Sequence, residues 1–361
     1  MSFARRLRTA VLFLVMSGGI AFAAGEVLSR AFHVADRLNG FPRRLFTPTD
    51  DLHLPYVLTP GIDISMRGMH VAVNEHGLRG PATTERPAPG VHRILALGDS
   101  VTFGEGLEVE AAFPALLERE FAARTGARYE VLNAGVEGYN AEAELAFLRE
   151  RGLALEPETV VVGFNLNDYD YAPVLGPLGI LTRDPAARVS TRSLANVSEF
   201  YFLLRWLATT RGRPLGDRGA AGLTPRPGER FSDLDRYVSA LRKRYYAHPS
   251  DGCWQVMVDA LRGLGETARA HRLRLVIAIL PDGDQVGVPD PDLLPQRKVL
   301  AICAEAALDC LDLYPVFAAA APHGELFFDI MHPNAAGHRL IARALAEHLL
   351  AAAGFVSGSG V

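Results

Sequence analysis

The protein has 361 residues, of which 49% are hydrophobic and 22% charged, so it is too apolar for an intrinsically disordered chain. Its net charge of −4 gives no global basic surface of the kind that nucleic-acid-binding proteins carry, and we expect no nucleic acid partner. The length allows one large α/β domain with extensions or two smaller domains.

The first 25 residues have the order of an export signal. Arg5, Arg6 and Arg8 precede an uncharged, mostly apolar run over residues 9–25, and basic residues on that flank stay on the cytoplasmic side of the membrane. Ala21 and Ala23 form an A-x-A cleavage pattern, but the run is long for a signal core of about 7–15 residues. We expect either a cleaved signal peptide or, as the preferred interpretation, an uncleaved membrane anchor. Both place the rest of the chain outside the cytoplasm, in the periplasm or at the cell surface.

Residues 26–90 are expected to form an N-terminal extension that is partly β. Turn-forming stretches lie at residues 47–51, 59–61, 75–80 and 86–90, and hydrophobic alternation at 69–77 predicts one or two short strands. This segment is expected to fold against the main body.

From residue 91 onward, strand-like and helical stretches alternate. The strand-like stretches are 93–98, 129–135, 157–168, 273–281 and 309–315, and the helical ones are 110–126, 140–155, 252–272, 295–308 and 333–353. Such alternation predicts a three-layer α/β/α sandwich with a mostly parallel sheet of about five strands over residues 91–355. Residues 356–361 are expected to form a flexible tail.

Residues 169–250 interrupt this alternation. A structureless loop of that length is uncommon in a compact domain, so we expect an inserted helical lid or cap, with one amphipathic helix within residues 198–212.

The three cysteines, Cys253, Cys303 and Cys310, contain no C-x-x-C pair, which argues against a zinc or redox motif. Cys303 and Cys310 can pair if the body is exported, but buried free thiols are the favoured interpretation.

Polar residues follow the predicted strands at the sheet edge where open parallel sheets bind ligands. Ser100 follows the first strand, and Asp329 and His332 precede the last helix. A serine hydroxyl needs a base before it becomes a nucleophile. His332 is the candidate base, with Pro333 expected at the first helical position, and Asp329 can orient the imidazole and fix its tautomer. A tetrahedral intermediate also needs hydrogen-bond donors, for which the Ser100 N–H, the Gly135 N–H and the Asn167 side-chain amide are candidates, with a turn glycine and a structural cap as the alternatives for the last two.

Four ordered blocks carry a specific resemblance. They read GDSVTFGEG from residue 98, LNAGVEGYN from residue 132, GFNLND from residue 163 and DIMHPNAAGH from residue 329. The chain resembles the SGNH, or GDSL-type, serine hydrolase family, and its extension resembles membrane-anchored bacterial members. The resemblance implies a flavodoxin-like SGNH fold, nucleophile Ser100, base His332, orienting Asp329, an oxyanion hole of Ser100, Gly135 and Asn167, and no metal or cofactor. Asn167 is preferred to Asn165 because it directly precedes Asp168, as in the family's N-D pair.

The expected function is hydrolysis of carboxylic esters, acyl or acetyl, through an acyl-enzyme. The substrate would be an ester-bearing small molecule, lipid or glycan. Two alternatives stay open: an O-acyltransferase that uses the same triad on a cell-envelope glycan, and a non-catalytic glycan-binding protein on a hydrolase fold. A metal-dependent hydrolase using Asp329, His332 and His338 is a weaker alternative.

Overall fold

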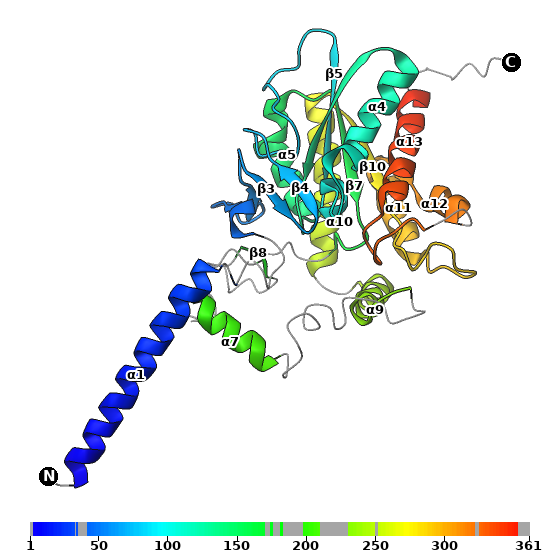
Figure 1. Cartoon of the computed structure of the whole chain (residues 1–361). Coiled ribbons are helices and arrows are strands. Elements are labelled where there is room, and N and C mark those ends of the chain that lie inside the picture. Colours follow the sequence, from blue (N-terminus) through cyan, green and yellow to red (C-terminus); the bar gives the residue numbers. More distant parts are fainter. Residues whose placement is uncertain are drawn as a thin grey trace. The chain divides into compact units, whose positions relative to one another are not determined.

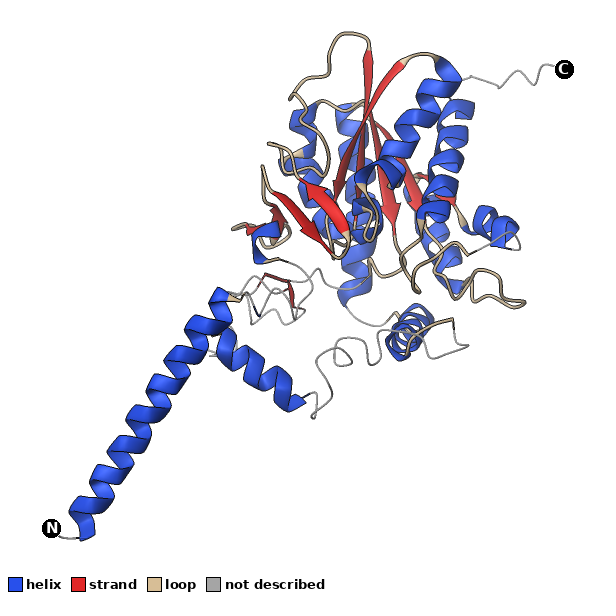
Figure 2. Ribbon diagram, viewed as in Figure 1, coloured by secondary structure: helices blue, strands red, loops and turns tan. Residues whose placement is uncertain are grey.

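The strands predicted after residue 91 form one sheet, in the order β11-β10-β7-β5-β6, and every neighbouring pair is parallel (Figure 2). The strands are β5 (Val91–Gly98), β6 (Arg128–Gly135), β7 (Thr159–Phe164), β10 (Arg274–Ile279) and β11 (Asp309–Asp312). The central strands β7 and β10 are buried on both faces, which is typical of a parallel sheet covered by helices. This sheet confirms the predicted α/β architecture.

Helices cover both faces of the sheet (Figure 1). On one face α4 (Phe113–Thr125) packs against α13 (Ala335–Ala352), and their apolar side chains share a core with Val161 and Val276 of the sheet. On the other face lie α5 (Ala141–Glu150), α10 (Gly252–His271) and α11 (Leu294–Ala306). The remaining short helices of this body are α3 (Ser100–Phe103), α12 (Tyr314–Ala320), and the 3₁₀ turns η2 (Val109–Ala111) and η3 (Gly152–Leu155).

The carboxyl ends of the three strands β5, β6 and β7 lie level with one another. Gly98 of β5 is paired with Gly135 of β6 on one side and with Gly163 of β7 on the other. The residues that follow these strands therefore emerge side by side at one edge of the sheet, as the sequence predicted.

The structure describes residues 3–32, 34, 42–169, 174–175, 181–182, 198–209, 230–249, 252–321 and 325–352. The described chain divides into two compact units, whose positions relative to one another are not determined. The unit that holds the sheet consists of Thr47–Pro173 and Gly222–Val361, and the other consists of Met1–Phe46 and Val174–Ala221.

The extension before the sheet contains short β structure, as its alternating pattern indicates. The strand β1 (Phe46–Pro48) pairs with β2 (Tyr56–Leu58), after the 3₁₀ turn η1 (Arg43–Leu45). Strands β3 (Asp63–Met66) and β4 (Met69–Ala72) form an antiparallel hairpin. Its two-residue turn is Arg67 and Gly68, both with positive φ, 47° and 79°, as a tight hairpin turn requires.

Among the described residues of the insertion there are two helices, where the sequence predicted one. The expected amphipathic helix is α7 (Glu199–Thr209), and the additional helix is α9 (Asp233–Ala247). The sequence signal for α9 was available but missed: Ser232 and Asp235 form a capping box at its start. Buried Arg242 of α9 forms ion pairs with Asp282 and Asp284. Two short strands, β8 (Val174–Leu175) and β9 (Leu181–Thr182), pair with each other. Much of the lid prediction falls on residues 183–197 and 210–229, which lie outside the described residues.

The preferred interpretation of Cys303 and Cys310 as free thiols is wrong. The two residues form a disulfide across the turn that joins α11 to β11. Ala307, in the left-handed conformation with φ 52°, ends the helix and turns the chain back, so that the two Cα atoms lie 6.3 Å apart. Cys253 is buried and is not part of a disulfide.

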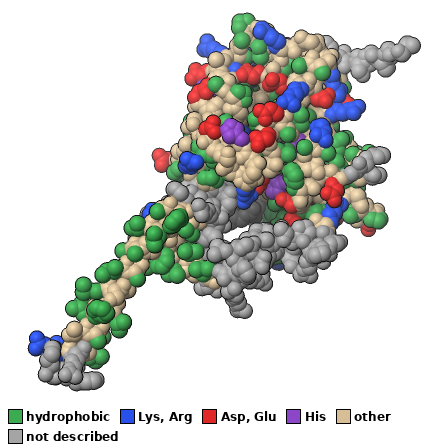
Figure 3. Space-filling view, in the orientation of Figure 1, with side chains coloured by type: hydrophobic (Ala, Val, Ile, Leu, Met, Phe, Trp, Pro, Cys, Tyr) green, Lys and Arg blue, Asp and Glu red, His purple; other side chains and the backbone are tan. Residues whose placement is uncertain are grey.

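In the smaller unit, helix α1 (Phe3–Ala31) extends past the predicted boundary at residue 25. Its segment Leu7–Ala31 is long and apolar enough to cross a membrane, a property that a signal sequence shares, and hydrophobic side chains line its surface (Figure 3). Within the same unit α7 packs against the end of α1, where the rings of Phe22 and Phe200 lie 5.5 Å apart and Glu26 accepts a hydrogen bond from the Phe200 N–H.

Candidate active site

The structure brings together the three residues expected to form a triad. Ser100 opens α3 directly after β5, and its Oγ lies 2.9 Å from Nε2 of His332. Nδ1 of His332 lies 2.7 Å from Oδ2 of Asp329. The three side chains therefore form a continuous hydrogen-bonded chain, which is the arrangement that allows an imidazole to take a proton from a serine hydroxyl.

Asp329 is fixed by its own loop. Its second oxygen, Oδ1, accepts hydrogen bonds from the backbone N–H groups of Met331 and His332, both at 2.8 Å. Burial disfavours its charge, but the hydrogen bond from the His332 ring, the charge of that ring and the two backbone N–H groups together outweigh burial, and the pKa of Asp329 lies below its usual value. Asp329 is therefore ionised at neutral pH, as an orienting acid must be.

His332 is held in a strongly acidic setting. Burial disfavours its charge, yet the hydrogen bond and charge of Asp329, together with the charge of Glu105, raise the pKa of His332 to about 10.

The predicted helix start at Pro333 is two residues early. Helix α13 begins at Ala335, because the Asn334 side chain accepts hydrogen bonds from the Ala336 and Gly337 N–H groups and caps the helix.

The oxyanion role predicted for Gly135 does not fit the structure. The Gly135 N–H already donates to Oδ1 of Asn133 at 3.0 Å. A Cβ atom at this position would lie 2.1 Å from the Phe103 nitrogen, so close packing of β6 against α3 requires a residue without a side chain here. Gly138, three residues later, takes φ 75° in the following turn and is only half-buried.

Asn167 lies next to the histidine loop. Its Nδ2 donates to Sδ of Met331 at 3.8 Å, and its Oδ1 has no hydrogen-bond partner among the described residues. Asn165, the alternative that the sequence offered, is 1% exposed. The half-buried Asn167 is thus the better placed of the two to reach a ligand.

Buried carboxyl groups lie behind the site. Asp99 caps α3 through a hydrogen bond from the Val101 N–H, and burial raises the pKa of Asp99 to about 6. Burial raises the pKa of Glu137, Glu144 and Asp168 well above the usual range. Burial therefore disfavours the charged form of these three carboxyl groups.

Glu105 is a site residue that the sequence reasoning missed. Its Oε2 lies 3.3 Å from Nε2 of His332, on the same ring nitrogen that faces Ser100. Its Oε1 accepts from the guanidinium of Arg67, at the tip of the β3–β4 hairpin. The sequence carried no signal for this contact, because a carboxylate between two loop glycines is common at a surface.

Arg79 is a second missed residue, and it fixes the end of the nucleophile helix. Its Nη1 donates to the carbonyl oxygens of Phe103 and Gly104, at 2.6 and 2.9 Å, and its Nη2 donates to those of His70 and Leu107. The side chain is 2% exposed, and the guanidinium also lies over the Phe103 ring. Arg79 therefore links the N-terminal extension to the loop that follows Ser100.

His338, considered above as a metal ligand, has another role. Its Nδ1 accepts a hydrogen bond from the Phe113 N–H at 2.9 Å, and burial lowers the pKa of His338 to about 3. The ring therefore joins α13 to α4.

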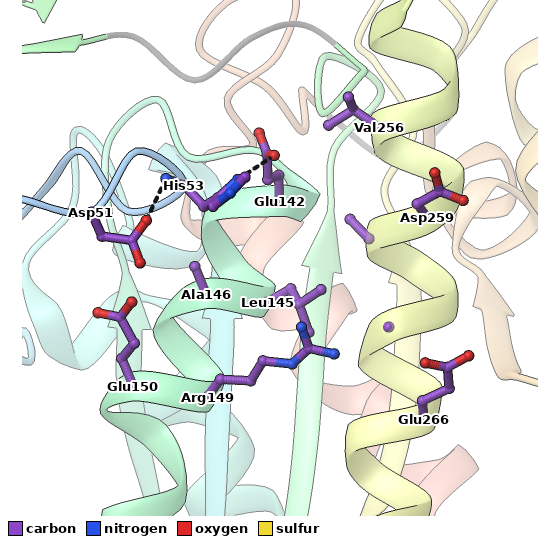
Figure 4. A pocket seen from close by; sticks show the side chains of 12 residues that line it. Asp51, His53, Glu142, Leu145, Ala146, Arg149, Glu150, Val256, Asp259 and Glu266 are labelled. Carbon is purple, nitrogen blue, oxygen red and sulfur yellow. Dashed lines mark hydrogen bonds and ion pairs between the residues drawn. The ribbon is translucent and has the colours of Figure 1, made fainter.

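A separate groove of about 470 Å³ lies between α5 and α10 (Figure 4). Five of its twelve lining residues are acidic, and His53 lies beside Glu142, with Nδ1 2.7 Å from the carboxylate oxygen. None of the triad residues lines it.

Comparison with known proteins agrees with this geometry. The family model described as the GDSL-like lipase/acylhydrolase family matches residues 96–340. The chain belongs to this family. A GDSL-like hydrolase of this kind is an ester-hydrolysing enzyme, and the matched range includes all the residues predicted for the triad and the oxyanion hole.

The solved structures that are similar to this GDSL-like hydrolase have low sequence identity to it. The structure of TesA is 17% identical, with a TM-score of 0.41, over 72% of this chain and 98% of that chain. Axe2, an acetylxylan esterase from Geobacillus stearothermophilus, is 16% identical, with a TM-score of 0.43, over 72% and 94%. The lipase/acylhydrolase from Enterococcus faecalis is 16% identical, with a TM-score of 0.40, over 72% and 96%. No curated protein sequence matches the chain.

Proposed function

We propose that this GDSL-like hydrolase cleaves carboxylic esters by nucleophilic catalysis through an acyl-enzyme. The observation that carries the proposal is the hydrogen-bonded chain from Ser100 Oγ through His332 to Asp329. Ser100 attacks the ester carbonyl while Nε2 of His332 accepts the hydroxyl proton. The same nitrogen then returns that proton to the leaving alcohol, and in the second half-reaction it takes a proton from the water that releases the acid.

The oxyanion of each tetrahedral intermediate needs donors that are in place before the reaction. We assign the Ser100 N–H and the Asn167 side-chain amide to this role. The third donor is proposed to come from the turn after β6, with the Gly138 N–H in place of the Gly135 N–H, because the latter is engaged by Asn133. Asp329 holds the imidazole and stabilises the imidazolium that forms in each half-reaction.

The proposal includes an extracytoplasmic location, with attachment to the membrane through α1. Two observations support it. The Leu7–Ala31 segment has the length and composition of a membrane span. The Cys303–Cys310 disulfide is a feature of oxidising compartments and is rare in the cytosol of most organisms.

Labelling of the full-length protein with a fluorophosphonate probe tests the nucleophile. We expect the label on Ser100, loss of both labelling and ester hydrolysis in Ser100→Ala, and neither loss in Ser65→Ala, a matched change on an exposed strand position of the β3–β4 hairpin. Labelling that persists in Ser100→Ala would overturn the assignment. Product analysis in the presence of an acetylated glycan and an acceptor glycan distinguishes release of free acid from acyl transfer.

A further inference from the structure

The position of Glu105 places a carboxylate where the alcohol part of an ester must pass. In serine hydrolases the base nitrogen that takes the nucleophile's proton also gives it to the leaving oxygen, so the leaving alcohol lies beside that nitrogen. Here the nitrogen is Nε2 of His332, and Oε2 of Glu105 lies 3.3 Å from it. The Glu105 side chain is 15% exposed, so a ligand can reach it.

This position is fixed relative to the nucleophile. The Glu105 N–H donates to the Ser100 carbonyl oxygen at 3.0 Å. Arg79 holds the carbonyl of the preceding residue, Gly104, and Arg67 binds the carboxylate itself. Glu105 therefore belongs to the same rigid turn as Ser100.

The charges around Glu105 favour an uncharged ligand. Arg67 faces Oε1 and His332 faces Oε2, so the carboxylate already has two cationic or protonatable partners. The buried Glu137 side chain is hydrogen-bonded to Glu105, and burial raises the pKa of Glu137 and of the neighbouring Asp99. A cationic alcohol would compete with Arg67, whereas an anionic one would be repelled by Glu105.

A hydroxyl group fits this setting better than a charged group. A carboxylate offers about four lone-pair positions, so Glu105 can accept a further hydrogen bond without losing Arg67, His332 or Glu137. A hydrogen bond from a hydroxyl to a charged acceptor is also stronger than one between neutral groups.

An exposed aromatic ring lies beside the same turn. Phe328 is 54% exposed, although it is separated from His332 by only three residues and its N–H donates to the His332 carbonyl oxygen at 2.8 Å. Its ring packs over Gly106, and a Cβ atom on residue 106 would lie 3.3 Å from a ring carbon of Phe328. A flat apolar surface next to a carboxylate suits a ligand with C–H groups on one side and hydroxyl groups at its edge.

We propose that Glu105 and Phe328 form the subsite for the alcohol part of the ester, and that this subsite selects an uncharged alcohol carrying a free hydroxyl next to the esterified one, as in a sugar or another polyol. The inference rests on the proposed ester hydrolysis at Ser100. Glu105 accepts the hydrogen bond of the free hydroxyl, and Phe328 covers the adjacent carbon skeleton.

A pair of small esters tests the hydroxyl requirement with the unmodified, full-length protein. The two esters are 2-hydroxyethyl acetate and 2-methoxyethyl acetate, which differ in whether the second oxygen can donate a hydrogen bond. We expect kcat/KM to be on the order of tenfold higher for the hydroxyl compound. Equal values for the two esters would overturn the proposal, as would faster hydrolysis of the cationic ester acetylcholine.

Variants then assign the effect to Glu105. In Glu105→Ala the preference for the hydroxyl ester should fall to about onefold, whatever the change in the absolute rates. Glu108→Ala is the matched control, because Glu108 lies in the same loop but accepts from the His70 N–H of the hairpin, and it should keep the preference. An unchanged preference in Glu105→Ala would overturn the assignment.

A variant of Phe328 tests the apolar part of the subsite. Phe328→Ala should raise KM for a monoacetylated pyranoside more than KM for 2-hydroxyethyl acetate. An equal change in the two KM values would show that Phe328 is not part of the subsite.

The outcomes for the subsite and for the proposed function are separable. If Ser100→Ala still releases acetate from both esters, the proposed nucleophilic mechanism fails. If Ser100→Ala abolishes hydrolysis while the unmodified protein treats the two esters equally, only the subsite fails.

Discussion

Oγ of Ser100 lies 2.9 Å from Nε2 of His332 although 232 positions separate the two residues in the chain. The parallel sheet explains this proximity. Ser100 follows β5 at the carboxyl edge, and the loop that carries His332 returns to the same edge before α13. Each residue has an ordinary local structure, and only the fold makes them a reactive pair.

Asp329→Asn should leave the loop in place but remove the charge that orients His332. An amide can donate to Nδ1 and so favour the wrong tautomer, and we expect kcat/KM to fall on the order of 10³- to 10⁴-fold. Steady-state kinetics on a generic acetyl ester measures this. Asp309→Asn, at an exposed carboxylate paired with His348, is the control and should have no effect on the rate. A loss of less than about tenfold would contradict the orienting role.

The raised pKa of His332 predicts a specific pH profile. His332 must be neutral to accept the serine proton, so kcat/KM should rise as pH increases, with a midpoint above the ordinary histidine value of 6.5. The acidic groups that face the imidazole are Asp329, Glu105 and Glu137. Glu105→Gln removes the charge 3.3 Å from Nε2 and should move the midpoint to lower pH. Identical midpoints in the two proteins would show that Glu105 does not act on His332.

The same pKa shift has a consequence for stability. Because the folded-state pKa is higher than the unfolded value, the charged form of His332 stabilises the fold fully below about pH 6.5. That contribution is lost as the pH rises through about 10. Urea unfolding between about pH 6.5 and 10 should show a smaller loss of the free energy of unfolding in His332→Gln than in the unmodified protein.

Arg79→Met should destabilise the protein strongly. The change keeps an apolar stem but leaves four backbone carbonyl groups without their guanidinium donors, and we expect the free energy of unfolding to fall by about 3 kcal/mol or more. Urea denaturation measures the change. Arg343→Met, at a 68% exposed side chain paired only with Glu347 among the described residues, should change it by about 0.5 kcal/mol or less. Equal effects of the two substitutions would contradict the anchoring role of Arg79.

Replacing Cys303 and Cys310 by serine together should lower the free energy of unfolding by about 2 kcal/mol, since the disulfide closes a short loop with a sequence separation of 7. Denaturation without reductant measures this loss. In the presence of reductant the unmodified protein should approach the stability of the double variant. A free thiol titration that finds three reactive cysteines in the unfolded, unreduced protein would show that the bond does not form.

Most of the sheet was predictable because its signals are local. The strands over 93–98 and 129–135 are short apolar runs bounded by turn residues, and the helix at 110–126 ends at a glycine. The structure shortens the last strand: β11 ends at Asp312, because the Asp312 side chain caps the next turn through the Tyr314 N–H and α12 begins there. Helix α9 was missed because the surrounding proline, glycine and arginine residues obscured its capping box.

The site was predictable only where residue type alone indicates chemistry. Ser100, Asp329 and His332 belong to a recognisable pattern, and the structure places them within hydrogen-bonding distance. Gly135 belonged to the same pattern, but residue types alone did not show that its N–H donates to the side chain of Asn133, two positions earlier. The contact of Glu105 with His332 depends on how one turn folds, and no pattern of residue types encodes it.

The β3–β4 hairpin has a practical consequence for work on this enzyme. Through Arg67 it reaches the carboxylate beside the His332 imidazole, yet it precedes the first strand of the five-stranded sheet in the chain. A protein trimmed back to the four motif blocks would therefore lose the contact of Arg67 with Glu105, the carboxylate beside His332. A water-soluble version made by deleting α1 has to retain the hairpin if its rates are to represent the whole molecule.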